Sequence, residues 1–305
     1  MKKRVFITGA QGFVGTHMSA QLSQRVNSER YLLTVPGSPY DLRDYDQLVG
    51  VLKSLNPDWV VHLAAISSVK VSIDAPRATY ETNFIGTLNL LEALKALDFK
   101  GRLLFVSSAD AYGVVEDSKL PISEDVPLSP RNPYAVSKAA AELLCKQYVY
   151  TSDLDVVICR PFNHIGPGQA LDFAISNFAH QISEIERNAV DPIIRVGDIE
   201  TTRDFLDVRD VVSSYIALLE FGIRGEVYNV CSGIERSVSS VLESLVKRSD
   251  ANIEILKDAG RYRNAEQRRV VGSNEKIRAQ TGWSPAIDFR HTLLSILDFH
   301  RNNSL

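Results

Sequence analysis

Three glycines between a short apolar segment and a helical one limit what this chain can fold into more than any other feature. Residues 4–8 are mostly apolar and lead directly to Gly9, a pattern typical of a strand buried in a parallel sheet. Gly12 and Gly15 follow at intervals of three, so the backbone can turn tightly and approach a pyrophosphate at a helix N-terminus. We therefore predict a dinucleotide-binding unit at the start of the chain. Its candidate cofactor-binding residues are Gly9, Gly12, Phe13, Val14 and Gly15.

Strand-like and helix-like segments alternate through the first half of the chain. Predicted strands lie at 31–35, 58–63, 102–108 and 154–160, and predicted helices at 44–54, 82–97 and 134–150. This alternation is typical of a doubly wound parallel sheet with right-handed crossovers. We expect an α/β fold of the Rossmann type, with ligands at the carboxyl ends of its strands.

The alternation becomes irregular after residue 161, in a loop-like segment rich in glycine and proline. The segments expected beyond it are helices at 171–188, 209–221 and 238–249, strands at 193–196, 226–230 and 252–256, and a C-terminal helix. We assign residues 1–163 and about 204–231 to the dinucleotide-binding domain. Residues 164–203 and 232–305 are assigned to a smaller, interleaved substrate-binding domain.

Composition excludes several functional classes. A net charge of −3 gives no electrostatic footprint for nucleic acid. Three widely separated cysteines, Cys145, Cys159 and Cys231, offer neither a disulfide framework nor metal-ligand spacing. No apolar run approaches the roughly 20 residues that span a bilayer. We expect a cytoplasmic protein without a cleaved leader, a metal, or a nucleic-acid or membrane partner.

The segment after the second predicted strand bears on the choice of cofactor. Many NAD enzymes carry an acid there that holds the ribose 2′-hydroxyl, whereas this chain has Val35-Pro36-Gly37-Ser38. No carboxylate excludes a 2′-phosphate and no arginine attracts one, so both NADPH and NADH remain open. Asp41, followed by Leu42, is either the capping acid of the next helix or a contact to the adenine.

Two later strand ends carry further candidates. Leu63, Ala64 and Ala65 are small or apolar enough for a dinucleotide to lie close to the backbone, and His62 before them is interpreted as a packed residue. The fourth predicted strand ends in Ser107-Ser108.

Tyr134 and Lys138 are the strongest candidates for chemistry. Pro133 favours a helix start, and a spacing of four places the two side chains on one helical face. An ammonium beside a phenol favours the phenolate, and a shift of about 3 units from its usual pKa of about 10 would bring it near neutral pH. Such a phenol is a suitable general acid for an alkoxide formed when hydride reaches a carbonyl. The alternative is a surface Tyr-x-x-x-Lys pair.

These features occur in one order, with Arg160-Pro161-Phe162-Asn163 and Arg203-Asp204-Phe205 after them. In this order they resemble an extended short-chain dehydrogenase/reductase acting on nucleotide sugars, over essentially the whole chain. The segments 160–169, 196–198, 228–233 and 265–266 are most similar to members that reduce GDP-4-dehydro-6-deoxy-D-mannose at its 4-keto group. The product expected from this resemblance is GDP-D-rhamnose. Alternatives are GDP-6-deoxy-D-talose, or an epimerase or dehydratase activity of the same family.

The resemblance implies a role for each matching residue. Tyr134 is the proton donor, and Lys138 lowers its pKa and contacts the nicotinamide ribose. Ser108, four residues before Tyr112-Gly113, orients the carbonyl oxygen. The cofactor set implied is completed by Asp41, Leu42, Leu63, Ala64, Ala65, Tyr134, Lys138 and Pro161. The substrate set implied is Ser108, Ala109, Tyr134, Asn163, Arg203, Arg263 and Glu266, the last two in a loop that closes over the nucleoside.

The chain departs from its dehydratase relatives directly after Ser108. Sugar 4,6-dehydratases carry an acidic pair there and GDP-fucose synthases a cysteine at the second place, whereas this chain has Ala109 and Asp110. Both differences favour simple reduction, and the role of Asp110 stays open. A cofactor-sensing regulator on the same fold is the alternative from another class, but such proteins typically lose the tyrosine or lysine.

Two surface features have competing interpretations. The basic cluster Arg261, Arg263, Arg268 and Arg269 is either solvated surface or a diphosphate site. Family analogy implies a homodimer through helices at about 82–97 and 134–150. Ala139, Ala140, Ala141 and Leu144 would give the second helix an apolar outer stripe, unless they are buried within the monomer.

Overall fold

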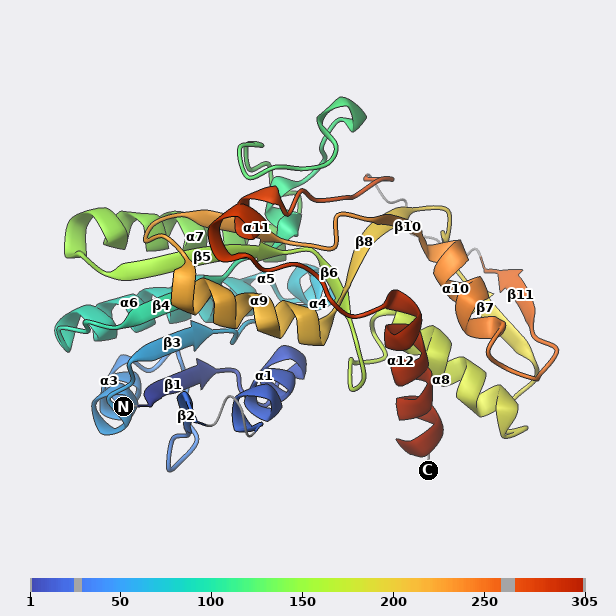
Figure 1. Cartoon of the computed structure of the whole chain (residues 1–305), viewed down its shortest axis with the longest axis horizontal. Coiled ribbons are helices and arrows are strands. Elements are labelled where there is room, and N and C mark those ends of the chain that lie inside the picture. Colours follow the sequence, from blue (N-terminus) through green and yellow to red (C-terminus); the bar gives the residue numbers. More distant parts are fainter. Residues whose placement is uncertain (1, 25–28, 259–266, 304–305) are drawn as a thin grey trace.

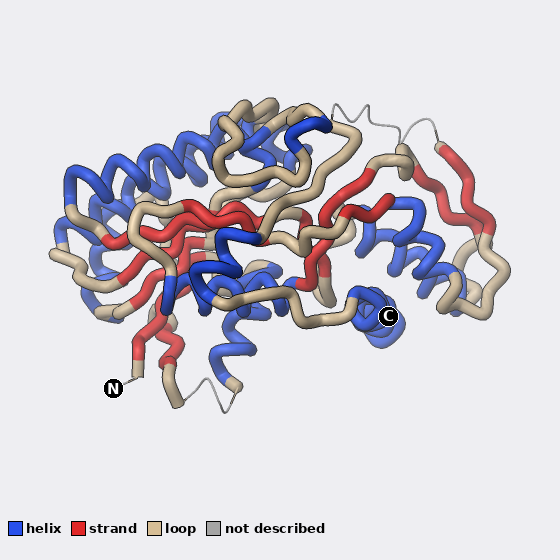
Figure 2. Tube along the Cα trace, turned by 45° about the horizontal axis from the view of Figure 1, so that its top comes forward, coloured by secondary structure: helices blue, strands red, loops and turns tan. Residues whose placement is uncertain are grey.

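The computed structural model describes residues 2–24, 29–258 and 267–303. These residues form two lobes, a larger one around a parallel sheet and a smaller one that holds two short sheets (Figure 1). Figure 2 shows the large sheet between layers of helices, with the smaller lobe at one end of it. Among the described residues, no helix has both the length and the apolar character needed to cross a membrane.

Six strands of the described chain form the large sheet, in the order β2-β1-β3-β4-β5-β9, and every neighbouring pair is parallel. Their bounds are β1 Lys3–Thr8, β2 Tyr31–Thr34, β3 Trp59–His62, β4 Arg102–Val106, β5 Asp155–Pro161 and β9 Val227–Val230. The predicted doubly wound α/β fold is confirmed. The order reverses at β1, because β2 lies on one side of it and β3 on the other. In such sheets this reversal marks a ligand-binding crevice.

Successive side chains along each strand enter opposite faces of the sheet. Val5 and Leu104 pack on one face, and Phe6 and Leu103 on the other. The first face is covered by α1 Phe13–Ser23, α9 Val208–Phe221 and α11 Glu275–Thr281. The second face is covered by α3 Tyr45–Leu55, α6 Gly86–Ala96 and α7 Pro133–Ser152. Because both faces are buried, the strands are almost continuously apolar, as the sequence predicts.

The smaller lobe has its own apolar core. Its strands are β6 Asn163–Ile165, β7 Ile193–Val196, β8 Thr202–Asp207, β10 Glu235–Ser237 and β11 Glu254–Lys257, and its helices are α8 Ala174–Glu186, α10 Val238–Val246 and α12 Phe289–Asn303. β8 pairs with both β6 and β10, and β7 pairs with β11. Since β6 follows β5 almost directly, the large sheet passes straight into the smaller lobe.

The segment predicted as one helix at 82–97 is more complex. It is preceded by α4 Val69–Asp74 and α5 Pro76–Tyr80, and it opens with one π-helical turn, η1, over Glu81–Ile85. π-turns inside helices frequently occur at functional sites. Short 3₁₀ turns, η2 Ala109–Tyr112 and η3 Asp117–Lys119, follow β4.

Two expectations about packing need correction. Ile277 and Trp283 belong to the core on the α1/α9 face of the large sheet, so this part of residues 232–305 packs with the dinucleotide-binding lobe. The remaining domain boundaries stay predictions. The expected outer stripe of α7 is also wrong, because Ala139 and Ala141 are buried within the monomer. Leu144 packs against the same core.

Candidate active site

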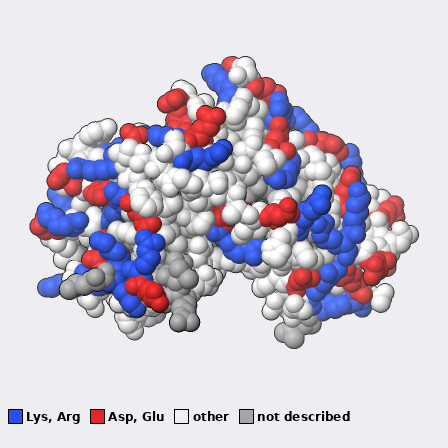
Figure 3. Space-filling view, viewed as in Figure 1, with Lys and Arg blue, Asp and Glu red and all other residues white. Residues whose placement is uncertain are grey.

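The predicted motifs lie at the carboxyl ends of the strands, which point toward the smaller lobe (Figure 1). The glycine turn follows β1 and Leu63 follows β3, so both lie where the strand order reverses. Ser107 and Ser108 follow β4. The space-filling view shows the surface hollowed between the two lobes (Figure 3).

The geometry of the glycine turn fits a dinucleotide. Gly9 has a φ of +73°, and a Cβ there would lie 2.8 Å from the Ala64 nitrogen. A Cβ at Gly15 would lie 2.3 Å from the Gly9 carbonyl oxygen, so these two glycines hold the turn against β3 and α1. Among the described residues, a Cβ at Gly12 would meet only the Gly9 carbonyl oxygen, at 3.3 Å. Gly12 is also the N-cap of α1 and makes no side-chain cap. Space and N–H groups at Phe13 and Val14 therefore remain for a pyrophosphate.

The start of helix α7 determines where Tyr134 lies. Asn132 caps the helix, since its Oδ1 accepts from the Ala135 nitrogen at 2.8 Å, and Pro133 occupies the first helical position. Tyr134 therefore lies at the helix start, where its hydroxyl is close enough to the Ser108 side chain to be influenced by it. Ser108 Oγ in turn accepts from the Asp110 nitrogen at 3.1 Å. The structure thus brings Ser108 and Tyr134 together, as predicted.

The expected effect of Lys138 on Tyr134 is wrong for this geometry. Burial raises the pKa of Tyr134 above its usual value, and the Asp110 carboxylate raises it further, while the Ser108 hydrogen bond opposes the shift. Lys138 does not contribute, because its Nζ donates to the Val106 carbonyl oxygen at 2.7 Å. Tyr134 is therefore a neutral phenol at pH 7, the form that can donate a proton.

The pKa of Lys138 is itself shifted from its usual value. Its side chain is buried on α7 with Nζ 5.4 Å from the centroid of the Phe105 ring. Burial lowers the pKa of Lys138 to about 8. Among the described residues no carboxylate pairs with it. A perturbed, unpaired cation in such a place is a mark of a functional site.

The Asp110 carboxylate acts electrostatically on both Tyr134 and Arg203. Asp110 is accessible to solvent, yet the protein around it raises its pKa, against the opposing charge of Arg203. Arg203, on β8, donates through Nη1 to the Thr202 carbonyl oxygen at 2.7 Å. Burial lowers the pKa of Arg203, while Asp110 and Asp198 oppose that shift. Within the described chain, Arg203 forms no ion pair.

The strand that carries Arg203 is fixed by its neighbour Asp204. This buried carboxylate accepts from the Ser232 nitrogen at 2.7 Å, the Ser232 hydroxyl at 2.6 Å and the Gly233 nitrogen at 2.9 Å. It also accepts from the Gly272 nitrogen at 3.2 Å. The hydrogen bonds join β8 to the loop after β9, and so place Arg203 opposite the end of the large sheet.

The basic cluster does not act as one diphosphate site. Arg268 pairs with Asp198 at 2.9 Å, and Arg269 binds Glu235 through two nitrogens, at 2.8 and 2.7 Å. These two arginines are therefore already neutralised, which contradicts the functional interpretation for them. The remaining predicted members Arg261, Arg263 and Glu266 lie outside the described residues.

The structure also places four other residues that were predicted to bind cofactor or substrate: Asp41, Leu42, Pro161 and Asn163. Asp41 is not the cap of α3, because Asp44 Oδ1 accepts from the Gln47 nitrogen at 3.0 Å and Asp41 pairs with Arg43. Its adenine contact stays a prediction. Leu42 is buried beneath α6. Pro161 ends β5 and Asn163 is exposed on β6, on the side of the large sheet that carries the catalytic candidates.

Sequence reasoning missed a buried polar network beside these residues. Asn83 Nδ2 donates to the Ser137 hydroxyl at 2.9 Å and to the Ile66 carbonyl oxygen at 3.0 Å. Thr87, one helical turn later, donates to the Asn83 carbonyl oxygen at 2.6 Å. The i, i+4 spacing of two polar residues in an apolar helix is the signal that could have indicated it.

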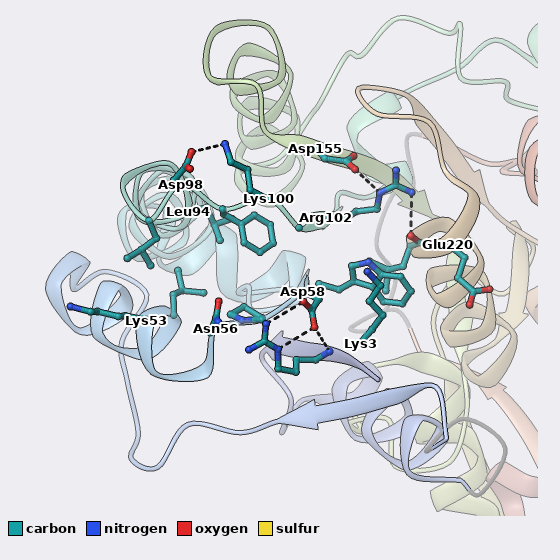
Figure 4. A pocket seen from close by; sticks show the side chains of 18 residues that line it. Lys3, Lys53, Asn56, Asp58, Leu94, Asp98, Lys100, Arg102, Asp155 and Glu220 are labelled. Atoms are coloured by element: carbon teal, nitrogen blue, oxygen red, sulfur yellow. Dashed lines mark hydrogen bonds and ion pairs between the residues drawn. The ribbon is translucent and has the colours of Figure 1, made fainter. Parts of the chain in front are cut away.

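A second cavity, of about 790 Å³, lies at the opposite, amino end of the sheet (Figure 4). Three cations of its lining are paired, with Arg4 bound to Asp58, Lys100 to Asp98 and Arg102 to Asp155. Lys3 and Lys53, which also line it, are exposed and form no ion pair within the described chain. None of the predicted site residues lines it.

Comparisons with known proteins agree with this geometry. The family model for GDP-mannose 4,6 dehydratase matches residues 6–295. The chain is 46% identical to the GDP-6-deoxy-D-mannose reductase of Pseudomonas aeruginosa, over 97% of each chain. It is 30% identical to the GDP-6-deoxy-D-talose 4-dehydrogenase of Aggregatibacter actinomycetemcomitans, over 90% of each.

Solved structures extend the comparison to the backbone. The structure of RMD from Pseudomonas aeruginosa complexed with NADPH superposes with a TM-score of 0.94, at 44% identity and over 99% of both chains. The match covers the glycine turn, the Ser108–Tyr134–Lys138 arrangement and the smaller lobe together. The chain therefore belongs to the GDP-mannose 4,6-dehydratase family, a nucleotide-sugar branch of the extended short-chain dehydrogenases/reductases.

Proposed function

We propose that this protein is an NAD(P)H-dependent oxidoreductase that reduces the 4-keto group of GDP-4-dehydro-6-deoxy-D-mannose to give GDP-D-rhamnose. The observation that carries the proposal is the neutral Tyr134 phenol beside the Ser108 side chain, with the unpaired Lys138 in the next turn of the same helix. The 46% identical reductase supports the substrate.

Ser108 and Tyr134 have separate roles in the proposed reduction. When bound along the glycine turn, NAD(P)H supplies the hydride that forms the new C–H bond at C4 of the sugar. Ser108 donates a hydrogen bond to the carbonyl oxygen and holds it beside Tyr134. As negative charge develops on that oxygen, Tyr134 transfers its proton to it and is left as phenolate. Solvent then restores the phenol.

We propose that Lys138 acts at the step of the reaction in which Tyr134 becomes a phenolate. In the ligand-free geometry its ammonium binds the Val106 carbonyl oxygen, one strand residue before the two serines. We propose that this ammonium turns from Val106 toward Tyr134 when substrate and cofactor are bound, and there stabilises the phenolate that proton transfer leaves behind. We also propose, from the family resemblance, that it contacts the nicotinamide ribose.

Simple reduction is favoured over dehydration because Ala109 follows Ser108. Dehydration needs an acid that protonates the departing hydroxyl, and an alanine side chain has no proton to give. Incubating the protein with GDP-mannose and oxidised cofactor tests this directly. We expect no 4-keto-6-deoxy product, and its appearance would contradict the assignment as a reductase only.

The main experiment supplies GDP-4-dehydro-6-deoxy-D-mannose and NADPH. We expect one nicotinamide oxidised for each sugar reduced, and NMR of the product should show the GDP-D-rhamnose configuration at C4. GDP-6-deoxy-D-talose is the second candidate product, since a 30% identical relative is a GDP-6-deoxy-D-talose 4-dehydrogenase. Substrate turnover without net oxidation of NADPH would instead indicate an epimerase.

Both NADPH and NADH should serve as cofactors. The exposed residues Gly37 and Ser38 after β2 carry no carboxylate to repel a 2′-phosphate and no arginine to bind one. The ratio of kcat/KM for the two cofactors measures this. A preference beyond about 1000-fold, which corresponds to roughly 4 kcal/mol, would contradict it.

Substrate binding is assigned to the rim of the smaller lobe. Arg203 forms no ion pair within the described chain, and a guanidinium can bind two diphosphate oxygens at once. We propose that it holds the diphosphate together with Asn163, and that Arg263 and Glu266 contact the nucleoside.

We further propose that the protein is a homodimer. The exposed apolar residues of α7 are Val136, Leu143 and Tyr150, spaced by seven along one helical face. Light scattering at micromolar concentration should give the mass of a dimer, and Leu143→Glu should give a monomer. Ile223→Glu, at an exposed apolar residue on another part of the surface, is the matched control. A monomeric wild-type protein would contradict the proposal.

A further inference from the structure

A buried chain of hydrogen bonds passes through His62, a residue that the proposed chemistry does not use. His62 is the last residue of β3 and is 1% exposed. Its Nδ1 lies 2.7 Å from Thr8 Oγ1 at the end of β1, and its Nε2 lies 3.0 Å from Thr87 Oγ1 on α6. The imidazole therefore joins the strand before the glycine turn to the helix that packs beneath α7.

The surrounding bonds fix which nitrogen carries the proton. The single hydroxyl proton of Thr87 is used by the Asn83 carbonyl oxygen at 2.6 Å, so Thr87 can only accept from His62. Nε2 must then be protonated and Nδ1 must be an acceptor. Thr8 satisfies Nδ1 with its hydroxyl proton, and its oxygen accepts the Ala64 N–H at 3.2 Å. In this arrangement each N–H and O–H proton of the chain donates to one acceptor, and each donor and acceptor role is fixed.

The chain continues into the catalytic helix. The side-chain amide of Asn83 binds both the N–H and the C=O of Ile66, at 2.8 and 3.0 Å. It also donates to Ser137 Oγ at 2.9 Å, and Ser137 donates to the Tyr134 carbonyl oxygen at 2.7 Å. Residues 64 and 66 of the cofactor loop are thus tied to the backbone of Tyr134 through His62 and Asn83.

A charged imidazole would break this arrangement. Protonated Nδ1 would have to donate to Thr8 Oγ1, which already receives the Ala64 N–H and whose own proton would then lose its acceptor. Burial, with a smaller contribution from the Lys138 ammonium, lowers the pKa of His62 to about 3. The Phe105 ring, 5.9 Å away, closes another side of the imidazole.

We infer that His62 is a positioning residue whose neutral, Nε2-protonated imidazole sets the placement of loop 63–66 against helix α7. The distance between the dinucleotide on that loop and the Tyr134–Lys138 pair depends on this bridge. The kinetic part of the inference rests on the proposed reduction, whereas the tautomer and the geometry do not.

The first test reads the tautomer without any substrate. In protein labelled with ¹⁵N-histidine, one ring should show the neutral Nε2–H pattern unchanged from pH 5.5 to 7, a range below the pKa of about 8 of the neighbouring Lys138, and Thr87→Val should shift its resonances. A titration of this ring within that range, or an Nδ1–H tautomer, would overturn the inference. This result is independent of whether the 4-keto sugar is the substrate.

The second test uses matched threonines. Thr87 and Thr79 are both fully buried and both donate to the carbonyl oxygen four residues earlier, but only Thr87 also meets His62. Thr87→Val should slow single-turnover hydride transfer about tenfold at saturating NADPH, and Thr87→Ser should restore it to within about twofold. Thr79→Val should lower the melting temperature by a similar amount and leave the rate unchanged.

A purely structural role predicts a different pattern, in which Thr87→Val and Thr79→Val lose stability alike and keep the wild-type rate. That pattern would overturn the positioning role. If the wild-type protein does not reduce the 4-keto sugar, NADPH affinity replaces the rate, with Thr87→Val weaker than Thr79→Val. Equal affinities for the two variants would likewise contradict the inference.

Discussion

The two ends of the large sheet differ in how their cations are paired and buried. At the amino ends, around the cavity of Figure 4, Arg4, Lys100 and Arg102 each have a carboxylate partner within 3.2 Å. At the carboxyl ends, Lys138 and Arg203 donate to backbone carbonyl oxygens and form no ion pair within the described chain. Lys3 and Lys53 at the cavity also form no ion pair within the described chain, but they are exposed, whereas Lys138 is buried. The cavity of Figure 4 therefore does not mark the chemistry, whereas a buried cation without an ion pair does.

The contrast follows from topology and solvation. Crossovers of a doubly wound sheet leave the crevice at its carboxyl ends, where a bound ligand supplies the missing charge. Pairs exposed to solvent contribute only about 0–1 kcal/mol each. A buried cation without a partner is costly, and the lowered pKa of Lys138 expresses that cost.

The largest difference should be in rate. Lys138→Met removes the cation that we propose stabilises the phenolate in the ligand-bound enzyme, so we expect hydride transfer to fall by about 10² to 10⁴, the usual value of acid–base assistance. Arg102→Met, at the amino end, should stay within twofold of wild type. Stopped-flow measurement of NADPH oxidation in a single turnover compares them. Equal losses in the two variants would remove the distinction between the ends.

Next in size is the effect of Arg203. Its charge is unpaired within the described chain, and a hydrogen bond to a charged group is worth about 1.5–3 kcal/mol. Arg203→Met should therefore lower kcat/KM by about 10- to 100-fold, mainly through KM for the sugar nucleotide. Arg269→Met, at an arginine already bound to Glu235, is the control and should change kcat/KM less than threefold. A larger effect at Arg269 would reassign the diphosphate site.

The third prediction concerns stability. The folded pKa of Lys138, about 8, lies below the value of about 10.4 in an unfolded chain. Between these values the unfolded state binds more protons, so stability rises with pH, and the cost of burial is complete below pH 8. Lys138→Met should thus stabilise the ligand-free protein at pH 7 by on the order of 2 kcal/mol, allowing for the lost bond to Val106.

Urea unfolding at several pH values measures this gain. It should shrink as the pH rises from 8 toward 10.4, because the wild-type lysine then becomes neutral in the folded state. A destabilised Lys138→Met variant at pH 7, with activity lost, would show that the lysine is not strained before ligands bind.

The smallest effect should come from the paired end. The Arg102 side chain is 18% exposed and binds Asp155 at 3.0 Å. It also donates to the Leu219 carbonyl oxygen at 3.1 Å. Asp155→Asn, which keeps the shape and weakens the ion pair, should lower the free energy of unfolding by about 1 kcal/mol or less. Thermal unfolding at two salt concentrations checks this, since the difference from wild type should narrow in high salt.

The regular part of the fold, and the strands and helices that carry the three catalytic candidates, could be predicted from the sequence for clear reasons. Buried parallel strands are continuous apolar runs, and the glycine turn, Ser108, Tyr134 and Lys138 all lie within or beside such strands and their helices. Strands β6 and β10 were missed because each has three residues, too few to show a period. α11 was missed because its contacts are with distant elements, α9 and β9.

The electrostatics of the site could not be obtained from spacing. The i, i+4 relation of Tyr134 and Lys138 suggested a lowered phenol pKa, but burial and Asp110 raise it. The same limit applies to Arg268 and Arg269, whose partners Asp198 and Glu235 come from other segments. Such effects depend on which distant side chains the fold brings near, and one sequence does not contain that information.

The central claim is that the neutral phenol of Tyr134 gives its proton to the sugar oxygen. Tyr134→Phe keeps the ring and deletes that proton. Tyr215→Phe is the matched control, because this buried hydroxyl nearby has no hydrogen-bond partner in the described chain. Single-turnover hydride transfer to GDP-4-dehydro-6-deoxy-D-mannose, at saturating NADPH, should fall by about 10² to 10⁴ in Tyr134→Phe and stay near wild type in Tyr215→Phe. If Tyr134→Phe retains more than about a tenth of the wild-type rate, the phenol is not the acid, and Asp110 becomes the group to test.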